Sequence, residues 1–195
     1  MRTALHWWPA VAVGGMFLLG RLVGKGSTPL DSRLLAIDAP DPLLVFIAAP
    51  VQIAVLGAAV TYALWRRRWQ LAAVAALCPP VAVVSAQLLK RVFDRTRDGE
   101  FAYPSGHITA LVVVAGMVVL VAGGRLSVVV AAAVAVMVGM VLVGISFHYF
   151  TDTVGALLLG SAYVAVAARL VIHRPDHALD RRQPRCDLRH SGWLP

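Results

Sequence analysis

Long apolar runs alternate with short polar stretches along most of the chain. The six apolar segments are approximately residues 5–23, 43–65, 69–89, 106–123, 127–147 and 152–172. Each is close to the roughly 20 residues that cross a bilayer as an α-helix. We therefore predict an all-α integral membrane protein whose six transmembrane helices form one bundle.

Arginine residues mark one side of this predicted bundle. If all six segments span the membrane, the Arg66–Arg68 triplet, Arg125 and the basic tail fall on the same side. The positive-inside rule makes that side cytoplasmic. We therefore expect cytoplasmic N- and C-termini, a membrane domain of residues 1–172 and a basic cytoplasmic tail of residues 173–195.

The first apolar segment has a second interpretation, a secretory signal peptide, because Arg2 precedes it. However, Arg21 and Lys25 flank its far end, and no small-residue cleavage site follows. These features favour a retained helix.

The composition narrows the class of protein further. Hydrophobic residues make up 59% of the chain and charged residues 14%, against about 45–50% and about a quarter in soluble domains. The net charge of +8 is explained by arginines in cytoplasmic loops, so we expect no nucleic-acid partner. Cys78 and Cys186 offer no spacing for a disulfide or a metal site, and we expect neither a metal nor a cofactor.

Three polar stretches fall together at the opposite, outer side of the six-helix arrangement. They are LKRVFDRTRD after the third segment, PSGH before the fourth, and SFHYFTD between the fifth and the sixth. Together they contribute Lys90, Arg91, Arg95, Arg97, His107, His148 and Asp152. Four cations on this side oppose the positive-inside trend, and a bound anion is the simplest explanation.

The residue types in these stretches suit such an anion. Ser105 is a good N-cap and Gly106 permits close backbone approach, so the start of the fourth helix predicts an anion site with His107 in its first turn. His148 and Asp152 are spaced i, i+4 and share a face if the sixth helix begins at or before His148. A carboxylate on one imidazole nitrogen fixes the tautomer and leaves the other nitrogen as a nucleophile or base.

Each feature also has a structural explanation. PSGH alone is compatible with an ordinary capped helix start, and His148 with Asp152 is compatible with an interfacial histidine beside a capping aspartate. Lys90 and Arg97 could extend toward lipid headgroups. The convergence of all three stretches favours a site.

With this pattern the chain resembles the type 2 phosphatidic acid phosphatase superfamily over about residues 70–172. Pro-Ser-Gly-His is intact at 104–107, six residues separate Lys90 from Arg97, and three separate His148 from Asp152. The sequence departs from the family at Asp98, where proline is usual, and at Val141 and Leu142, where serine and arginine are expected.

The resemblance implies metal-independent hydrolysis of a phosphoester or diphosphate in two steps. His148 would attack phosphorus while Asp152 stabilises the developing imidazolium, and His107 would donate a proton to the leaving lipid oxygen. Lys90, Arg97 and the backbone of Ser105 and Gly106 would hold the phosphoryl oxygens.

The departures from the family pattern lead to two further expectations. In the family the missing arginine helps to hold the phosphate, which Leu142 cannot do, and Arg95 is a candidate substitute. Six residues separate Arg97 from Pro104, so the outer loop is too short to form much of a lid.

We therefore expect a lipid phosphatase of a bacterial inner membrane, with its active site facing outward and a lipid phosphate as substrate. Polyprenyl phosphates or diphosphates are favoured over phosphatidic acid and phosphatidylglycerol phosphate by analogy with envelope lipid recycling. One alternative is a catalytically impaired relative that binds lipid phosphate. Another is a small lipid transporter, for which the polar candidates within helices are Gln52, Thr61, Ser85 and Gln87.

Overall fold

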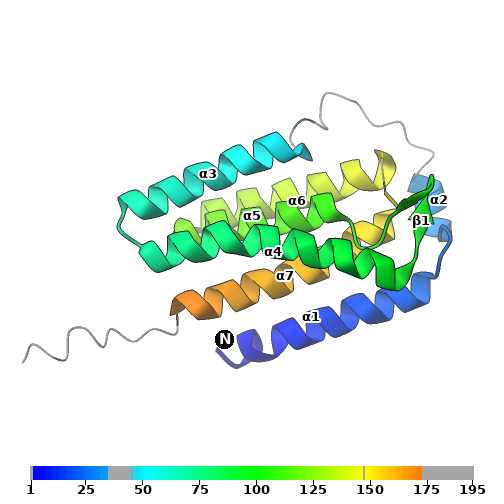
Figure 1. The fold of residues 1–195 in the computed structure, drawn as a ribbon, viewed down its shortest axis with the longest axis horizontal. Helices are drawn as coiled ribbons and strands as arrows, with labels where there is room; N and C mark the ends of the chain where they lie inside the picture. The colour runs from blue at the N-terminus through cyan, green and yellow to red at the C-terminus, as the bar shows by residue number, and fades with distance from the viewer. Residues whose placement is uncertain (1, 35–44, 46, 147, 173–195) are drawn as a thin grey trace, which may run out of the picture.

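The computed structural model describes residues 2–34, 45, 47–146 and 148–172. Within them the protein is mostly helical (Figure 1). The elements are α1 (Arg2–Val23), α2 (Pro29–Leu34), α3 (Ala49–Trp65), α4 (Trp69–Phe93), β1 (Thr96–Arg97), β2 (Glu100–Phe101), α5 (Gly106–Val121), α6 (Leu126–Ser146) and α7 (Phe150–Ile172). The predicted tail, residues 173–195, lies outside the described residues.

The long helices run along one axis of the molecule (Figure 1). The α3–α4 and α5–α6 turns lie at the end where α1 begins and α7 finishes, and we name this the arginine end after Arg66, Arg67, Arg68 and Arg125. The other end carries α2, the β1–β2 hairpin and the first turns of α5 and α7, and we name it the histidine end after His107 and His148.

Helices α5 and α7 are the centre of the bundle. Helix α5 packs against α3, α4, α6 and α7, and α7 also packs against α1, α4 and α6. Glycines bring these two helices together, because a Cβ at Gly116 would overlap Val164 and one at Gly160 would overlap Val112. Small residues allow this close approach in membrane helix pairs, where dispersion contacts replace the hydrophobic effect between helices.

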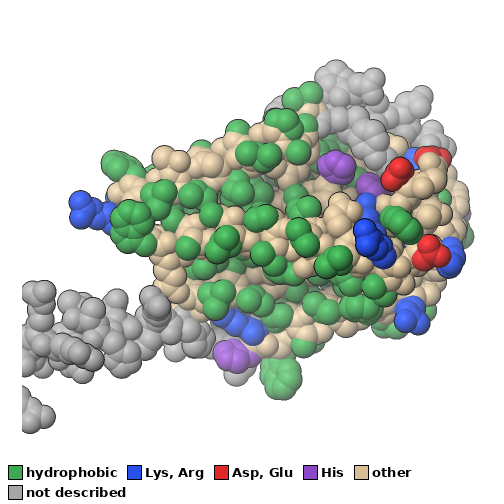
Figure 2. All heavy atoms as spheres, viewed as in Figure 1, with side chains coloured by type: hydrophobic (Ala, Val, Ile, Leu, Met, Phe, Trp, Pro, Cys, Tyr) green, Lys and Arg blue, Asp and Glu red, His purple; other side chains and the backbone are tan. Residues whose placement is uncertain are grey.

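On the face shown in Figure 2, hydrophobic side chains cover the middle of the bundle and charged side chains gather toward its ends. Large hydrophobic side chains stand exposed on the flanks of several helices, for example Ile53, Leu77, Val84 and Met137. Such continuous apolar surface is unfavourable in water and typical of a face that meets lipid.

Three helices, α4, α6 and α7, are long and apolar enough to cross a membrane, while α3 and α5 are shorter apolar helices. The predicted helical fold is confirmed, and these three apolar helices suggest an association with a membrane. Six spans and cytoplasmic termini remain predictions.

The β1–β2 hairpin follows α4 and explains one departure from the family pattern. Thr96 pairs with Phe101 and Arg97 with Glu100, so Asp98 and Gly99 form a two-residue turn. Their φ angles are 52° and 84°, the positive values that a type I′ hairpin turn requires and that Asp-Gly favours. Proline is restricted to φ near −65° and could not occupy this turn position.

Candidate active site

The two histidines of PSGH and SFHYFTD lie side by side at the histidine end. His107 is exposed in the first turn of α5, and His148 is buried just before α7. Their ring centroids are 6.3 Å apart, although 40 residues separate them in the chain. The packing of α5 against α7 and α6 therefore brings two titratable rings close together.

The N-terminus of α5 opens onto the same end. The backbone N–H of Thr109 donates to the carbonyl of Ser105 at 3.0 Å, so the preceding N–H groups of Gly106, His107 and Ile108 have no acceptor within the helix. Ser105 is fully buried, yet its Oγ makes no capping bond and has no hydrogen-bond partner among the described residues. The start of α5 thus keeps several donors for an anion.

Tyr103 fixes the chain just before this helix start. Its side chain is fully buried, and its hydroxyl donates to the carbonyl of Met16 in α1. A Cβ at either Gly20 or Gly155 would overlap the Tyr103 ring, so both glycines are needed to make room for it. The ring therefore holds the segment that leads into Ser105 between α1 and α7.

Lys90 and Arg97 flank the site from α4 and β1. The Nζ of Lys90 donates to the carbonyl of Phe101 at 2.7 Å, which ties the end of α4 to the hairpin. The Nη2 of Arg97 donates to the carbonyl of Ser146 at 3.1 Å, and its Nε lies 3.4 Å from Asp98. Its Nη1 is buried and has no partner among the described residues, so this donor remains for an anion.

Asp152 and His148 are close but are not hydrogen-bonded. The Nδ1 of His148 lies 3.8 Å from Oδ2 of Asp152, and this oxygen accepts a hydrogen bond from the Tyr149 N–H at 3.1 Å. Helix α7 begins at Phe150, after His148, so the pair does not share a helical face as the spacing suggested. Asp152 therefore caps α7 and also places a carboxylate beside the imidazole.

Arg95 has a different environment from the one expected of a phosphate ligand. Its Nη1 donates to Asp152 and to Thr151, each at 2.8 Å, and its Nη2 donates to Asp31 at 3.0 Å and to the Gly26 carbonyl at 2.9 Å. The side chain is 1% exposed, and both carboxylates are fully buried. Both Nη atoms donate to protein acceptors, while the buried Nε has no hydrogen-bond partner among the described residues. The two carboxylates already neutralise the guanidinium, which argues against Arg95 as a substitute for the missing arginine.

Asp31 is the residue that sequence reasoning missed. It lies in α2, where its carboxylate accepts hydrogen bonds from the N–H and Oγ1 of Thr28 while its own N–H donates to Thr28 Oγ1. It also accepts from the N–H of Thr151 at 3.0 Å, at the start of α7. The Thr-x-x-Asp spacing of a capping box was the available signal for its local role.

These hydrogen bonds also set the charge state of Asp31. Burial acts to raise the pKa of this carboxyl, but hydrogen bonds from Thr28 and Thr151 outweigh it and leave the pKa below its usual value of 3.8. Asp31, Arg95 and Asp152 form a network of two carboxylates and one guanidinium, with a formal net charge of −1, that lies beside His148.

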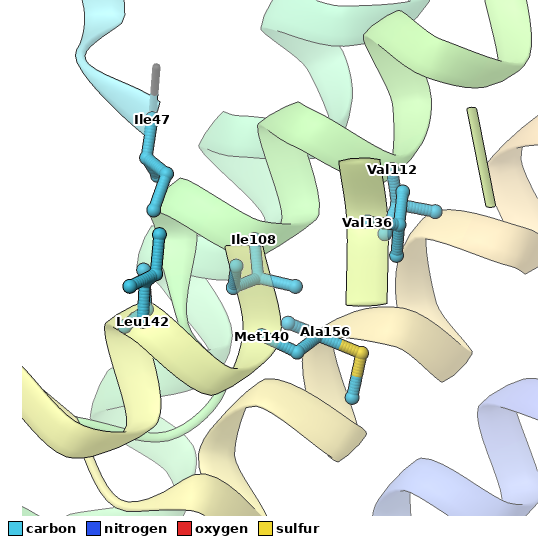
Figure 3. Packing of buried hydrophobic residues seen from close by; sticks show 8 residues of the cluster. Ile47, Ile108, Val112, Val136, Met140, Leu142 and Ala156 are labelled. Atoms are coloured by element: carbon cyan, nitrogen blue, oxygen red, sulfur yellow. The ribbon is translucent and has the colours of Figure 1, made fainter. Parts of the chain in front are cut away.

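Leu142, where the family pattern places arginine, is part of an apolar cluster (Figure 3). Its neighbours in this cluster include Ile47, Ile108 and Val143, and only 7% of its surface is exposed. Position 142 does face the bundle interior near the start of α5, but its surroundings are built for an aliphatic side chain.

Among the described residues, no group of three or more His, Cys, Asp or Glu side chains is arranged to hold a metal ion. Comparisons with protein-family models, with curated proteins and with solved structures found no match to this chain.

Proposed function

We propose that the protein is a membrane lipid phosphatase that acts through a phosphohistidine intermediate. The observation that carries the proposal is the approach of the His107 and His148 rings at the N-terminus of α5. Arg97 adds an Nη1 without a hydrogen-bond partner among the described residues, and its Nη2 donates to the carbonyl of Ser146, two residues before His148. Buried donors without partners are rare in proteins and commonly mark a place where a polar ligand is bound. A phosphoryl group supplies the acceptors that these donors lack.

In the first step, a nitrogen of His148 forms a bond to phosphorus and the bond from phosphorus to the lipid oxygen breaks. The Nδ1 of His148 faces Asp152, so Nε2 is the nitrogen available for attack. The His107 ring lies close enough to His148 to give a proton to the leaving lipid oxygen. In the second step, His107 accepts a proton from water as that water displaces His148 from phosphorus.

The buried charge network assists the same step. As His148 gains a bond to phosphorus its ring becomes cationic, and the net −1 of the network stabilises that charge. Arg95 touches Asp152 and not the reacting atoms, so we assign it as a positioning residue. Arg97, Lys90 and the α5 N–H groups balance the charge that develops on the phosphoryl oxygens.

The apolar flanks support a lipid substrate. A lipid phosphate can keep its tail in the bilayer while its headgroup reaches the histidine end, where the polar residues lie. We favour a polyprenyl phosphate or diphosphate, with phosphatidic acid and phosphatidylglycerol phosphate as further members of the same class. We place the histidine end on the outer side of a bacterial inner membrane, because arginines mark the other end.

The test is phosphate release by detergent-solubilised protein from a panel of these lipid phosphates. We expect His148→Ala to abolish release and His107→Ala to reduce it by about 10²–10⁴. His6→Ala, which removes a histidine on α1, is the matched control and should remain active. Trapping an acid-labile, base-stable phosphoenzyme with labelled substrate in the wild type and not in His148→Ala would identify the intermediate.

A second function, lipid-phosphate binding without turnover, is favoured by one specific observation. Leu142 lies in an apolar cluster and Arg95 is neutralised by two carboxylates, so Lys90 and Arg97 are the cations left to hold a phosphate. This second function would be supported if the wild-type protein binds the lipid phosphates but releases no more phosphate than His148→Ala does.

A further inference from the structure

A groove opens between α3 and α5 at the arginine end, far along the bundle from the histidines. Its volume is about 560 Å³. The lining side chains include Val55, Ala58, Tyr62, Val118 and Val121, with Arg66, Arg68 and Arg125 at its polar end. The groove therefore combines an apolar channel with three guanidinium groups.

The charge around this groove has one sign. No acidic residue lines it, and none of its three arginines forms an ion pair within the part of the chain that the structure describes. The described acidic residues, Asp31, Asp94, Asp98, Glu100 and Asp152, belong to α2, to the segment from α4 to the hairpin, and to the start of α7. All of these lie at the histidine end, where the acidic side chains of Figure 2 appear.

The walls and the depth of the groove indicate what kind of anion fits. Val55 and Tyr62 lie two turns apart on α3, about 10 Å along the helix axis, so the apolar walls run well away from the charges. A second cavity of about 310 Å³ shares Val55 and Val118 and extends the apolar surface toward α6. A free anion would contact the arginines but not the apolar walls, so an anion with an attached apolar chain fits the groove better.

Two tryptophans place the polar end of the groove at a membrane interface. Trp65 and Trp69 flank the arginine triplet and are 75% and 67% exposed. Tryptophans at this position mark the headgroup level of a bilayer. The arginines therefore stand at the depth of lipid phosphates, and the apolar walls stand at the depth of acyl chains.

We propose that this groove is a binding site for an anionic phospholipid, with the phosphate on Arg66, Arg68 and Arg125 and an acyl chain between α3 and α5. The site is separate from the candidate active site and does not depend on its chemistry. A second copy of the chain is a poorer occupant, because a copy packed in the same orientation would present its own arginines to the groove.

Native mass spectrometry of the detergent-solubilised full chain tests the proposal, since it counts bound lipids and reads the oligomeric state together. The probes are short-chain phosphatidylglycerol, phosphatidylcholine with the same chains, and glycerol phosphate as the headgroup alone. We expect retained phosphatidylglycerol and much weaker retention of the other two. Removing two arginines with Arg66→Gln/Arg68→Gln should weaken apparent affinity for phosphatidylglycerol by about 30-fold.

Matched variants separate this groove from a general charge effect. Arg67→Gln/Arg91→Gln removes the same charge from positions outside the groove and should keep the affinity within about threefold. Ala58→Phe fills the groove without changing charge and should also reduce binding, whereas Ala54→Phe, one turn away on the same helix, should not. Thermal unfolding of each variant without lipid confirms that it is folded.

Three outcomes would overturn the proposal. Equal retention of phosphatidylcholine would show that binding does not require an anionic headgroup. Equal retention of glycerol phosphate would show that the site binds a free anion and not a lipid. If the groove variants instead changed the oligomeric mass and left lipid binding intact, the groove would be an interface between copies of the chain.

Discussion

Replacing Arg95 with methionine removes the guanidinium that lies between Asp31 and Asp152. Methionine has a similar length and no charge, so the change is mainly electrostatic. It leaves two carboxylates that are fully buried in the protein. It also removes hydrogen bonds to Thr151 and to the Gly26 carbonyl, which join the α1–α2 connection to the start of α7.

The size of the effect follows from burial. Removing one partner of a buried ion pair costs about 3–5 kcal/mol, because the remaining charge keeps its desolvation penalty without its counter-charge. For a chain of this length each kcal/mol lowers Tm by about 2–4 °C, so Arg95→Met should lower Tm by about 6–20 °C. Arg91→Met is the control, because Arg91 is exposed near the end of α4, four residues before Arg95, and its replacement should change Tm little.

A double-mutant cycle with Asp31→Asn isolates the electrostatic part. Asp31→Asn alone leaves Arg95 paired with Asp152, and in the Arg95→Met background it removes one of the two uncompensated carboxylates. The combined loss should therefore be smaller than the sum of the single losses, by about 1–3 kcal/mol. Thermal unfolding followed by circular dichroism in one detergent, with all four proteins in parallel, measures it.

Two results would refute this reasoning. If Arg95→Met unfolds at the same temperature as Arg91→Met, the buried network does not stabilise the fold. If the two changes are additive, Arg95 and Asp31 do not interact. A well-folded Arg95→Met protein whose KM for a lipid phosphate rises while kcat is retained would instead make Arg95 a direct phosphate ligand.

Four further predictions concern charge, metal and topology. The folded-state pKa of Asp31 is depressed, so its contribution to stability is present above about pH 4 and is lost as the pH falls through the folded value. In Asp31→Asn the free energy of unfolding, measured against pH, should therefore fall less steeply on the acid side than in the wild type. Arg97→Ala should cut kcat/KM for the best lipid phosphate by about 10², since it removes a few kcal/mol of charge stabilisation, and an effect no larger than that of Arg91→Ala would contradict this role. Phosphate release should be unchanged by EDTA, and activity lost to EDTA and restored by Mg²⁺ would rule out metal-independent hydrolysis. Glu100→Cys, on the exposed hairpin, should react with an impermeant thiol reagent on intact cells and Arg125→Cys should not, and the reverse pattern would invert the proposed orientation.

Helix positions were largely readable from the sequence, because each apolar run must satisfy its own backbone hydrogen bonds in lipid. The predicted starts at 69 and 106 coincide with the first residues of α4 and α5. The hairpin after α4 was not predicted. Its signal, Asp98-Gly99, is a strong hairpin turn, but the strands on either side are two residues long and carry no alternating pattern.

The candidate site was predictable in its parts and not in its contacts. Counting helices placed His107 and His148 at one end, and tertiary packing decided that their rings approach each other. The i, i+4 spacing suggested that Asp152 orients His148 on one helical face, whereas α7 begins later and Asp152 is shared between Tyr149, Arg95 and the imidazole.

The sequence by itself determined that this chain is a helical protein with membrane character, because hydropathy and segment length are local properties. An apolar run of this length that lies in lipid forms a helix, since only a helix satisfies its backbone hydrogen bonds within the segment. Only the tertiary structure decided how the cations at the histidine end are paired. Arg95 and Arg97 are two residues apart and chemically identical in the sequence. Arg95 is neutralised by buried carboxylates from α2 and α7, whereas Arg97 pairs with the exposed Asp98 of its own hairpin turn, because electrostatic pairing depends on distances that residues far apart in the chain set together.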